Sequence, residues 1–236
     1  PEIAVLLNVD LDHHTTYASL AEVEQLFEDW LAKVPKVVRA EQLEPVDLSL
    51  ALPGEHNRLN AAAALAALEL AGVERAAAEG VIVEYRGAGR RFEARGEAGG
   101  VRVFDDYGHH PTEVAATLAA AREQVGEGRL AVFFQPHLYS RTRHLAREFA
   151  QALAGADAVC IADIYAARED PVAGVSGKLV VDALAEIRPG MPLAWTPTLA
   201  DGARFLAGWA RAGDLVFTIG AGDVDKAGPM LLKALA

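Results

Sequence analysis

Short apolar runs alternate with segments of helical periodicity along most of the chain. The first apolar run is IAVLLNV, residues 3–9, and its composition predicts a buried strand. Residues 20–34 (LAEVEQLFEDWLAKV) place apolar side chains at the spacing of an amphipathic helix. An alanine-rich segment, 59–70, predicts a second helix that ends at Gly72.

The alternation is clearest beyond GAGRR, residues 87–91, which has the composition of a linker. Four β-rich apolar runs follow it, at 101–106, 130–135, 158–163 and 215–220. Helical segments begin near Pro111, Ser140, Lys178 and Leu199, and a last one follows Asp223. Strands that alternate with helices of this length predict an α/β fold with a doubly wound, mostly parallel sheet. We therefore expect two domains, 1–88 and 89–236, with ligand sites at the carboxyl ends of the strands.

Composition narrows the possible partners. The chain has 22 Lys and Arg against 33 Asp and Glu, a net charge of −11 over 236 residues. This balance argues against a nucleic-acid surface, although a few placed arginines suffice for a small anionic substrate. No apolar run approaches the roughly 20 residues of a membrane span. The single cysteine, Cys160, lies within an apolar run and predicts a packed thiol in a reducing compartment.

Six of the seven histidines directly follow an apolar run, where sites are built in parallel sheets. The first such loop is NVDLDHHTTY, residues 8–17, in which Asp12 and His13 are suitable metal ligands. The alternative is that Asp12 caps the next helical segment and that His13 binds only backbone groups.

A second motif, LPGEHNRLN at 52–60, carries two amides on one helical face, because Asn57 and Asn60 are three residues apart. An amide is both a donor and an acceptor, as the edge of an adenine requires. The alternative is that Asn57 caps the alanine-rich helix.

Two further loops hold the remaining candidates. In VFDDYGHHPTEV, either Asp105 or Asp106 is placed to bind ribose hydroxyls. In FFQPHLYSRTRHL, aromatic and basic residues crowd the start of a predicted helix, which indicates an anion site: His137, Tyr139, Arg141 and Arg143. The alternative for the second loop is a solvated helix start in which Arg143 and Arg147 pair with Glu148.

Several common motifs are missing from the sequence. It has no G-x-x-x-x-G-K-[ST] phosphate loop, no G-x-S-x-G elbow and no C-x-x-C pair. The stretch GAGDV, residues 220–224, is only a weak dinucleotide signal because it lacks the third glycine.

The motifs occur in an order that closely resembles the Mur ligases, from the first residue to nearly the last. The segments that carry the resemblance are NVDLDHHTTY, LPGEHNRLN, GRRFE, FDDYGHHPTE, FQPHLYSRT, IYAAREDP and GAGDV. Within the family, the resemblance is strongest to the ligases that join L-alanine to UDP-N-acetylmuramate. It implies part of a central ATP-binding domain at 1–88 and a Rossmann-like, doubly wound C-terminal domain at 89–236.

The resemblance implies a reaction and a compartment. In these enzymes ATP phosphorylates the muramyl carboxylate, the amine of L-alanine attacks the acyl phosphate, and ADP and phosphate leave. The implied partners are UDP-N-acetylmuramate and L-alanine, with ATP and Mg²⁺ as cofactors. The implied setting is cytoplasmic synthesis of peptidoglycan precursors.

The resemblance also assigns residues to the nucleotide and the metal. His13 matches the Mg²⁺ ligand of the central domain. Asn57 and Asn60 match the pair that contacts the base, and Asp106 matches the aspartate that holds the ribose. Arg91 matches the arginine after the linker that reaches the ATP phosphates or the ribose.

A second group of residues matches the loops that face the muramyl end and the incoming amino acid: His109, His110, His137, Tyr139 and Arg141. A guanidinium binds carboxylates and phosphates bidentately, so Arg141 suits either the amino-acid carboxylate or the acyl phosphate. A catalytic role is thereby implied for His13, Arg91 and Arg141.

The sequence also departs from the family pattern. The phosphate loop and the UDP-sugar domain are missing, and the stretch from Trp30 to Leu52 is shorter than usual. Leu138 stands where many members carry arginine. We therefore expect an incomplete ligase that is inactive alone. The alternatives are a non-catalytic binding module, the related murein tripeptide-recycling ligase, and a zinc hydrolase built on the histidines.

Overall fold

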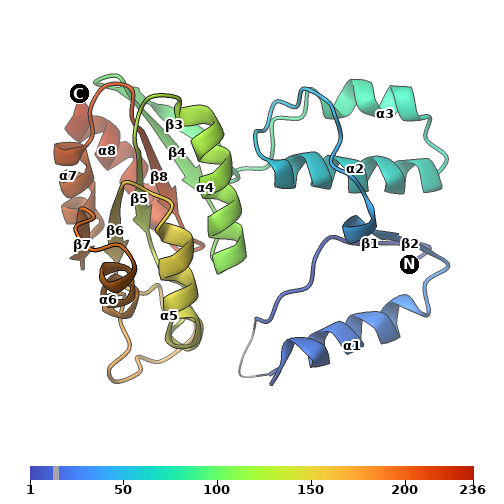
Figure 1. Ribbon diagram of the computed structural model, residues 1–236, viewed down its shortest axis with the longest axis horizontal. Helices are drawn as coiled ribbons and strands as arrows, with labels where there is room; N and C mark the ends of the chain where they lie inside the picture. Colours follow the sequence, from blue (N-terminus) through green and yellow to red (C-terminus); the bar gives the residue numbers. More distant parts are fainter. Residues whose placement is uncertain (13–15) are drawn as a thin grey trace. The chain divides into compact units, whose positions relative to one another are not determined.

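The computed structural model describes residues 1–12 and 16–236 and divides the chain into two compact units, Pro1–Arg86 and Gly87–Ala236 (Figure 1). The sequence placed the boundary between residues 88 and 89, inside the same glycine-rich linker. Each unit has its own hydrophobic clusters.

The first unit has two parallel strands, β1 (Ile3–Leu6) and β2 (Lys36–Arg39). Its helical elements are α1 (Leu20–Leu31), the short η1 (Ala40–Gln42), α2 (Glu55–Leu70) and α3 (Arg75–Ile82). Helix α1 begins where the Ser19 hydroxyl accepts a hydrogen bond from the backbone of Glu22. Strand β1 is shorter than the predicted range of residues 3–9. Strand β2 was not predicted.

The second unit is built on a six-stranded sheet with the order β3-β4-β8-β5-β6-β7. The strands are β3 (Glu93–Ala98), β4 (Val101–Asp106), β5 (Leu130–Phe134), β6 (Ala158–Ala162), β7 (Leu193–Thr196) and β8 (Leu215–Ile219). Only the β3–β4 pair is antiparallel. The prediction of an α/β fold with a mostly parallel, doubly wound sheet is therefore confirmed.

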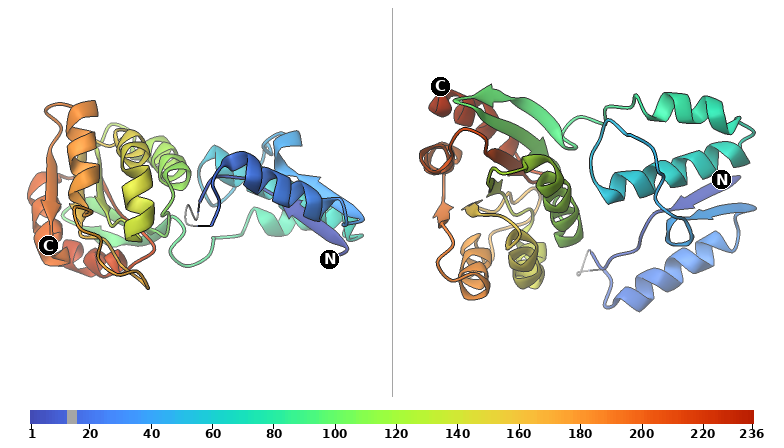
Figure 2. Two further views of the ribbon diagram at one scale, coloured as in Figure 1. Left: turned by 90° about the horizontal axis from the view of Figure 1, so that it is seen from below. Right: turned by 45° about the horizontal axis from the view of Figure 1, so that its top comes forward.

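Helices cover both faces of this sheet (Figures 1 and 2). One layer consists of α4 (Pro111–Val125), α5 (Tyr139–Leu153) and α6 (Lys178–Ile187). The other consists of α7 (Leu199–Trp209) and α8 (Ala227–Leu235), with the short η2 (Val224–Lys226) before α8. Four of the five predicted helix starts in this half lie within one residue of the observed ones.

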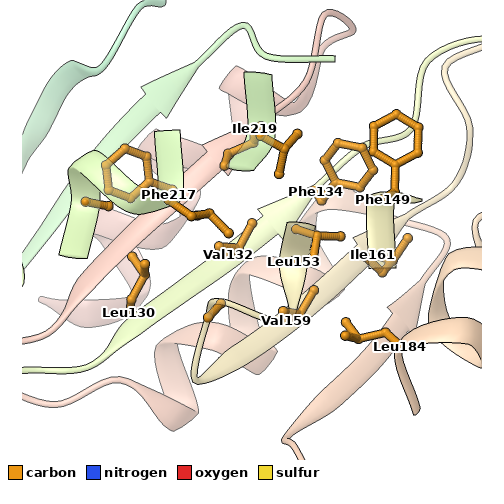
Figure 3. Packing of buried hydrophobic residues seen from close by; sticks show 14 of the residues in the cluster. Leu130, Val132, Phe134, Phe149, Leu153, Val159, Ile161, Leu184, Phe217 and Ile219 are labelled. Atoms are coloured by element: carbon orange, nitrogen blue, oxygen red, sulfur yellow. The ribbon is translucent and has the colours of Figure 1, made fainter. Parts of the chain in front are cut away.

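Alternate residues of the central strands supply the two cores. Leu130, Val132 and Phe134 of β5 face the α4–α5–α6 layer, together with Phe217 and Ile219 of β8 (Figure 3). Residues Ala131 and Phe133 face the opposite layer. All five residues of β5, β6 and β8 are buried, which explains why these strands appear in the sequence as continuous apolar runs.

The two edge strands of this sheet were not predicted. Strand β3 has the sequence EARGEA, in which no apolar run marks a strand, and β7 is only four residues long. In the parts of the chain that the structure describes, no helix is both long and apolar enough to cross a bilayer.

Candidate functional site

The carboxyl ends of β4, β8, β5 and β6 lie along one edge of the sheet in the second unit, because these four neighbours are parallel. Asp106 is the last residue of β4, and the loop after it carries His109 and His110. The loop after β5 leads through His137 into α5. This edge is where parallel sheets bind ligands. The fold thus brings together candidates that are about 30 positions apart in the sequence.

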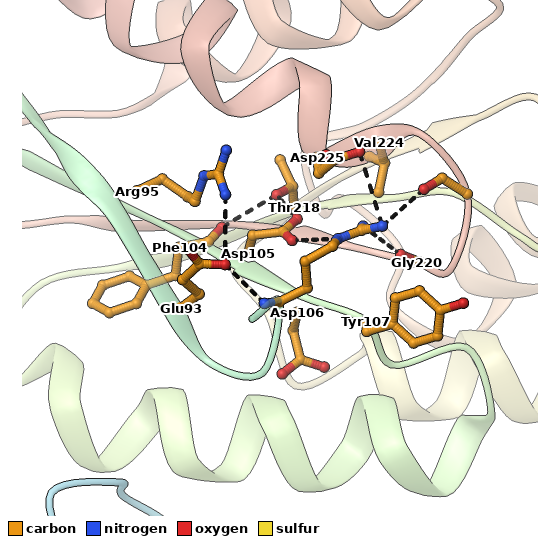
Figure 4. Close-up of polar contacts among 12 residues, drawn as sticks. Glu93, Arg95, Phe104, Asp105, Asp106, Tyr107, Thr218, Gly220, Val224 and Asp225 are labelled. Carbon is orange, nitrogen blue, oxygen red and sulfur yellow. Dashed lines mark hydrogen bonds and ion pairs between the residues drawn. The ribbon is translucent and has the colours of Figure 1, made fainter. Parts of the chain in front are cut away.

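Arg90 is held by groups at the ends of two strands, among them Asp105 and Gly220, which are labelled in Figure 4. Its Nε lies 2.7 Å from Oδ2 of Asp105, and its two terminal nitrogens donate to the carbonyls of Gly222 and Gly220 at 2.9 and 2.7 Å. Asp105 is fully buried and also accepts a hydrogen bond from the Thr218 hydroxyl. The sequence did not decide whether Asp105 or Asp106 is placed to bind ribose. Because the contacts of Asp105 are with the protein itself, Asp105 stabilises the fold.

Arg91 has a different environment, because 47% of its side chain is exposed. Its guanidinium carbon lies 5.4 Å from the centre of the Tyr107 ring, and its Nη1 lies 3.4 Å from Oε1 of Glu113. These contacts orient the guanidinium while leaving donors for a ligand. Arg91 is thus free to bind an anion where Arg90 is not.

Asp106 holds the backbone of the turn around it. Its Oδ2 accepts from the amide of Phe92 at 2.9 Å, and its Oδ1 accepts from the amide of Gly108 at 2.8 Å. Burial raises the pKa of the Asp106 carboxyl, and these hydrogen bonds work in the opposite direction. Each carboxylate oxygen has a second lone pair, so a ribose hydroxyl can still donate to it.

Glu113 organises the double-histidine loop from the first turn of α4. Its Oε2 accepts hydrogen bonds from the backbone amides of His109 and His110, at 2.9 and 3.1 Å. Burial raises the pKa of Glu113, but these hydrogen bonds and the charges of His109 and Arg91 outweigh it and hold the pKa below its ordinary value. Glu113 is therefore a carboxylate at neutral pH, and it fixes the loop that presents both histidines.

His137 and Arg141 form a pair four positions apart in the sequence, His137 before α5 and Arg141 within its first turn. Nη1 of Arg141 lies 3.1 Å from Nδ1 of His137, and Arg141 is only 4% exposed. The His137 ring stacks on Tyr165, with centroids 5.8 Å apart, and lies edge-to-face with His109 at 5.9 Å. Tyr139, the first residue of α5, is half-buried.

The anion expected at the start of α5 is supplied by the protein itself. The carboxylate of Glu169 accepts hydrogen bonds from the amide and the hydroxyl of Ser140. Burial raises the pKa of Glu169, but the hydrogen bonds from Ser140 and the Tyr139 amide hold it below its ordinary value. This helix N-terminus is therefore occupied by Glu169 rather than open to a ligand.

The alternative ion pairs proposed for α5 are not those observed. Arg147 lies 3.6 Å from Glu186 of α6, not against Glu148. The reason is geometric, since Arg147 and Glu148 are adjacent in the helix and point in different directions.

In the first unit, Asn57 and Asn60 lie in the first two turns of α2. The expectation that Asn57 caps this helix is wrong. Gly54, at φ 99°, is the N-cap, so α2 begins four residues before the predicted start. The Asn57 amide nitrogen donates to the carbonyl of Pro53 at 2.7 Å, which leaves its oxygen able to accept, and Asn60 is exposed.

His13, the predicted metal ligand, lies outside the described residues. Within the ranges 1–12 and 16–236, no three His, Cys, Asp or Glu side chains gather as a metal site. The described residues thus hold no ligand set for Mg²⁺.

The second unit matches a known domain family. Residues 90–222 match the model of the Mur ligase glutamate ligase domain, which is more than half of the chain. The fold, the residues along the sheet edge and this match together show that the chain belongs to the Mur ligase family.

The curated relatives it matches are UDP-N-acetylmuramate–L-alanine ligases. The Streptomyces coelicolor enzyme is 38% identical over 290 positions, covering all of this chain and 62% of the relative. The Kineococcus radiotolerans enzyme is 54% identical over 193 residues, covering 81% of this chain and 40% of the relative. The chain therefore spans about three fifths or less of these relatives. The 290 aligned positions of the first exceed the 236 residues here by 54, so the chain is also shorter internally.

Solved structures agree at the level of the fold. MurC from Thermotoga maritima superposes with a TM-score of 0.74 at 24% identity, over 99% of this chain and 59% of that one. A murein peptide ligase from Psychrobacter arcticus gives a TM-score of 0.66 at 21% identity, and the match covers 100% of this chain and 57% of that one.

Sequence reasoning missed four residues at this edge: Arg90, Glu113, Tyr165 and Glu169. The sequence held a signal for Glu113 alone, because a glutamate three residues after His110 is placed to accept from the backbone at a helix start. The other three depend on contacts between segments far apart in the sequence.

Proposed function

We propose that this chain is part of an ATP-dependent, ADP-forming ligase that joins L-alanine to UDP-N-acetylmuramate through an acyl phosphate. The observation that carries the proposal is the placement of Arg91, His109, His137 and Arg141 along one edge of the second unit. The names of the relatives, which are 38–54% identical, favour the same reaction. Its nucleotide substrates favour the cytoplasm as the compartment.

Arg141 binds a carboxylate or an acyl phosphate in this proposal. A guanidinium that is 4% exposed and already paired with His137 loses little further freedom when it binds an anion. His109, His110 and Tyr139 complete the surface that faces the muramyl end and the amino acid. Positive charge held in place near the reacting carbonyl stabilises the oxyanion that forms during attack.

Each unit carries residues that suit a nucleotide. In the second unit, Arg91 is the proposed contact to the phosphates through its exposed guanidinium, and Asp106 is the proposed acceptor for the ribose hydroxyls. In the first unit, Asn57 and Asn60 of α2 are the proposed contacts to a base. His13 remains the proposed Mg²⁺ ligand, and we derive no catalytic step through the metal because the described residues do not assemble its site.

The isolated chain should show no ligase turnover, since it contains no phosphate loop to position ATP. The test is phosphate release by the purified chain with ATP, Mg²⁺, UDP-N-acetylmuramate and L-alanine. A longer chain that carries the phosphate loop and the other segments present in the relatives runs beside it. Turnover by the long chain alone is the expected result. L-Alanine-dependent release by the short chain contradicts the prediction of inactivity.

Two other functions predict different results. A non-catalytic binding module would leave both chains silent while UDP-N-acetylmuramate binding survives His13→Ala. A tripeptide-recycling ligase would accept L-Ala-D-Glu-diaminopimelate in place of L-alanine. That second function is favoured only by the fold it shares with the Psychrobacter arcticus enzyme.

A further inference from the structure

Within the described residues, the polar contacts of the His109 ring are made by Nδ1. Its Nδ1 lies 3.1 Å from the carbonyl oxygen of Tyr107 and 3.4 Å from Oε2 of Glu113. Neither oxygen can donate a hydrogen bond, because one is a carbonyl and the other belongs to an ionised carboxylate. Nδ1 of His109 must therefore carry the proton, and in the neutral ring Nε2 carries the lone pair.

His137 is held in the opposite way. Its Nδ1 lies 3.1 Å from Nη1 of Arg141, and a guanidinium only donates hydrogen bonds. Nδ1 of His137 must therefore be the acceptor, which leaves the proton on Nε2. Protonating Nδ1 as well would place two donors and two positive charges against each other.

We infer that His109 Nε2 is the proton acceptor of this site and that His137 Nε2–H is a hydrogen-bond donor. The inference rests on the proposed function for the source of the proton, which is the ammonium group of the incoming amino acid. Two adjacent histidines, with ring centroids 5.9 Å apart, thus have distinct tasks that the fold assigns through their tautomers.

In the proposed step, the nitrogen of the amino acid loses two protons to two different acceptors. Nε2 of His109 takes one proton from the ammonium, which gives a neutral amine and an imidazolium. The amine nitrogen forms a bond to the acyl carbon, and the bond from that carbon to the phosphate oxygen breaks. Phosphate leaves with the electron pair and takes the second proton of the nitrogen. An amide, hydrogen phosphate and a protonated His109 result.

The surroundings of His109 suit a base. Glu113 is a carboxylate next to Nδ1, and the Tyr107 carbonyl accepts from the same nitrogen, so both stabilise the imidazolium that forms. Two positive groups lie near His109 as well. Arg91 pairs with Glu113, and Arg141 contacts Nδ1 of His137. The arrangement of base and orienting carboxylate follows the logic of a catalytic dyad.

The tautomers can be measured on the chain as it exists, without ligase activity. Long-range ¹H–¹⁵N NMR at neutral pH should show a protonated Nδ1 for His109 and a protonated Nε2 for His137. Arg141→Gln should release His137 and allow its other tautomer, while His109 keeps its own. Arg141→Lys keeps a hydrogen-bond donor at this position, so it should preserve the Nε2-protonated tautomer of His137 and serves as the matched control. A wild-type His109 protonated on Nε2 overturns the inference.

Chemical modification tests whether the lone pair is available. Diethyl pyrocarbonate acylates only unprotonated imidazole nitrogens, so His109, with its lone pair on Nε2, should react faster than His137, whose Nδ1 lone pair faces Arg141. Arg141→Gln should reduce the difference in reaction rate between the two histidines, because it releases Nδ1 of His137. Equal rates for the two histidines in the wild-type chain contradict the inference, whatever the chain's function.

The longer, active chain separates the inference from the proposed function. Without a base, the rate depends on the fraction of free amine, so His109→Gln should lower kcat at neutral pH and regain much of it at alkaline pH. His137→Gln should instead raise KM for the amino acid and keep the shape of the pH profile. If the wild-type long chain turns over and His109→Gln leaves the pH profile unchanged, the role of His109 is wrong. If the long chain never turns over while the tautomers are as stated, the proposed ligase function fails instead.

Discussion

Nε of Arg90 lies 2.7 Å from Oδ2 of Asp105, and this contact separates the roles of two adjacent arginines. Arg90 adopts a left-handed backbone conformation (φ 59°), which turns its side chain toward the strand ends. Its carbonyl accepts from the Tyr107 amide at 2.6 Å. Arg91, the next residue, is consequently left with an exposed guanidinium.

Replacing Arg90 should lower the stability of the chain, whereas replacing Arg91 should leave it nearly unchanged. Arg90→Ala leaves the fully buried Asp105 without its ion-pair partner, and losing one member of such a pair costs about 3 kcal/mol of unfolding free energy. Arg91→Ala removes an exposed side chain and should change stability by less than about 0.5 kcal/mol. Urea titrations of the two variants check this prediction.

The matched measurement is nucleotide binding. In the longer chain, Arg91→Ala should weaken ATP binding without a loss of stability, whereas the wild-type affinity should persist in any folded Arg90→Lys protein. If Arg91→Ala destabilises the chain as much as Arg90→Ala does, the division of roles between the two arginines is wrong.

The sequence was sufficient to predict the buried parallel strands and most helices of the second unit. Strands covered on both faces are recognisable because every residue is apolar, as in β5. Strand β3 is an edge strand made of EARGEA, and its pairing with β4 is set by the fold rather than by its own side chains. Local pattern therefore identifies the centre of the sheet and not its edges.

For the candidate site, the sequence predicted positions but not contacts. Histidines that follow strands were expected where parallel sheets build their sites, and the structure brings His109 and His137 together there. It could not show that Arg90 rather than Arg91 is bound by the fold, because that depends on contacts with Gly220 and Gly222, which are far away in the sequence. Nor could it show that Glu169, 29 positions away, occupies the start of α5.

Asp214 should make stability depend on pH in the acid range. Its carboxylate accepts from Arg129 Nη2 at 2.6 Å and from the Arg211 amide at 2.8 Å. Burial raises the pKa of Asp214, but these hydrogen bonds hold it below its ordinary value of 3.8. The stabilisation is therefore complete above pH 3.8 and is lost as the pH falls through the lower, folded-state pKa.

The variant that tests this is Asp214→Asn. At neutral pH it should lose roughly 2 kcal/mol of unfolding free energy, the usual scale for hydrogen bonds to a charged group. Urea titrations across the acid range should show the gap to wild type shrinking below pH 3.8. If the difference in unfolding free energy between wild type and variant stays constant with pH, the charge of Asp214 does not contribute to stability.

Cys160 should be unreactive in the folded chain. Its thiol is fully buried in β6, with Sγ 3.2 Å from the Thr196 hydroxyl. Burial raises the pKa of the thiol to about 11, and the thiolate is the reactive form. Ellman's reagent at mildly alkaline pH should detect no thiol in the native chain and one per chain in guanidinium chloride. Rapid reaction of the native chain would contradict the burial of this strand.

Two glycines of α7 should respond to alanine in opposite directions. A Cβ on Gly202 would lie 2.1 Å from Cζ of Phe133, inside the core between α7 and β5. Gly202→Ala should therefore cost about 1–3 kcal/mol, because the helix or the ring must shift. Gly208 has no atom within 4 Å of the same position, so Gly208→Ala should gain up to about 1 kcal/mol from helix propensity alone. Urea titration of both variants compares the two effects within one helix, and a Gly202→Ala protein as stable as wild type would show that α7 does not pack this closely on Phe133.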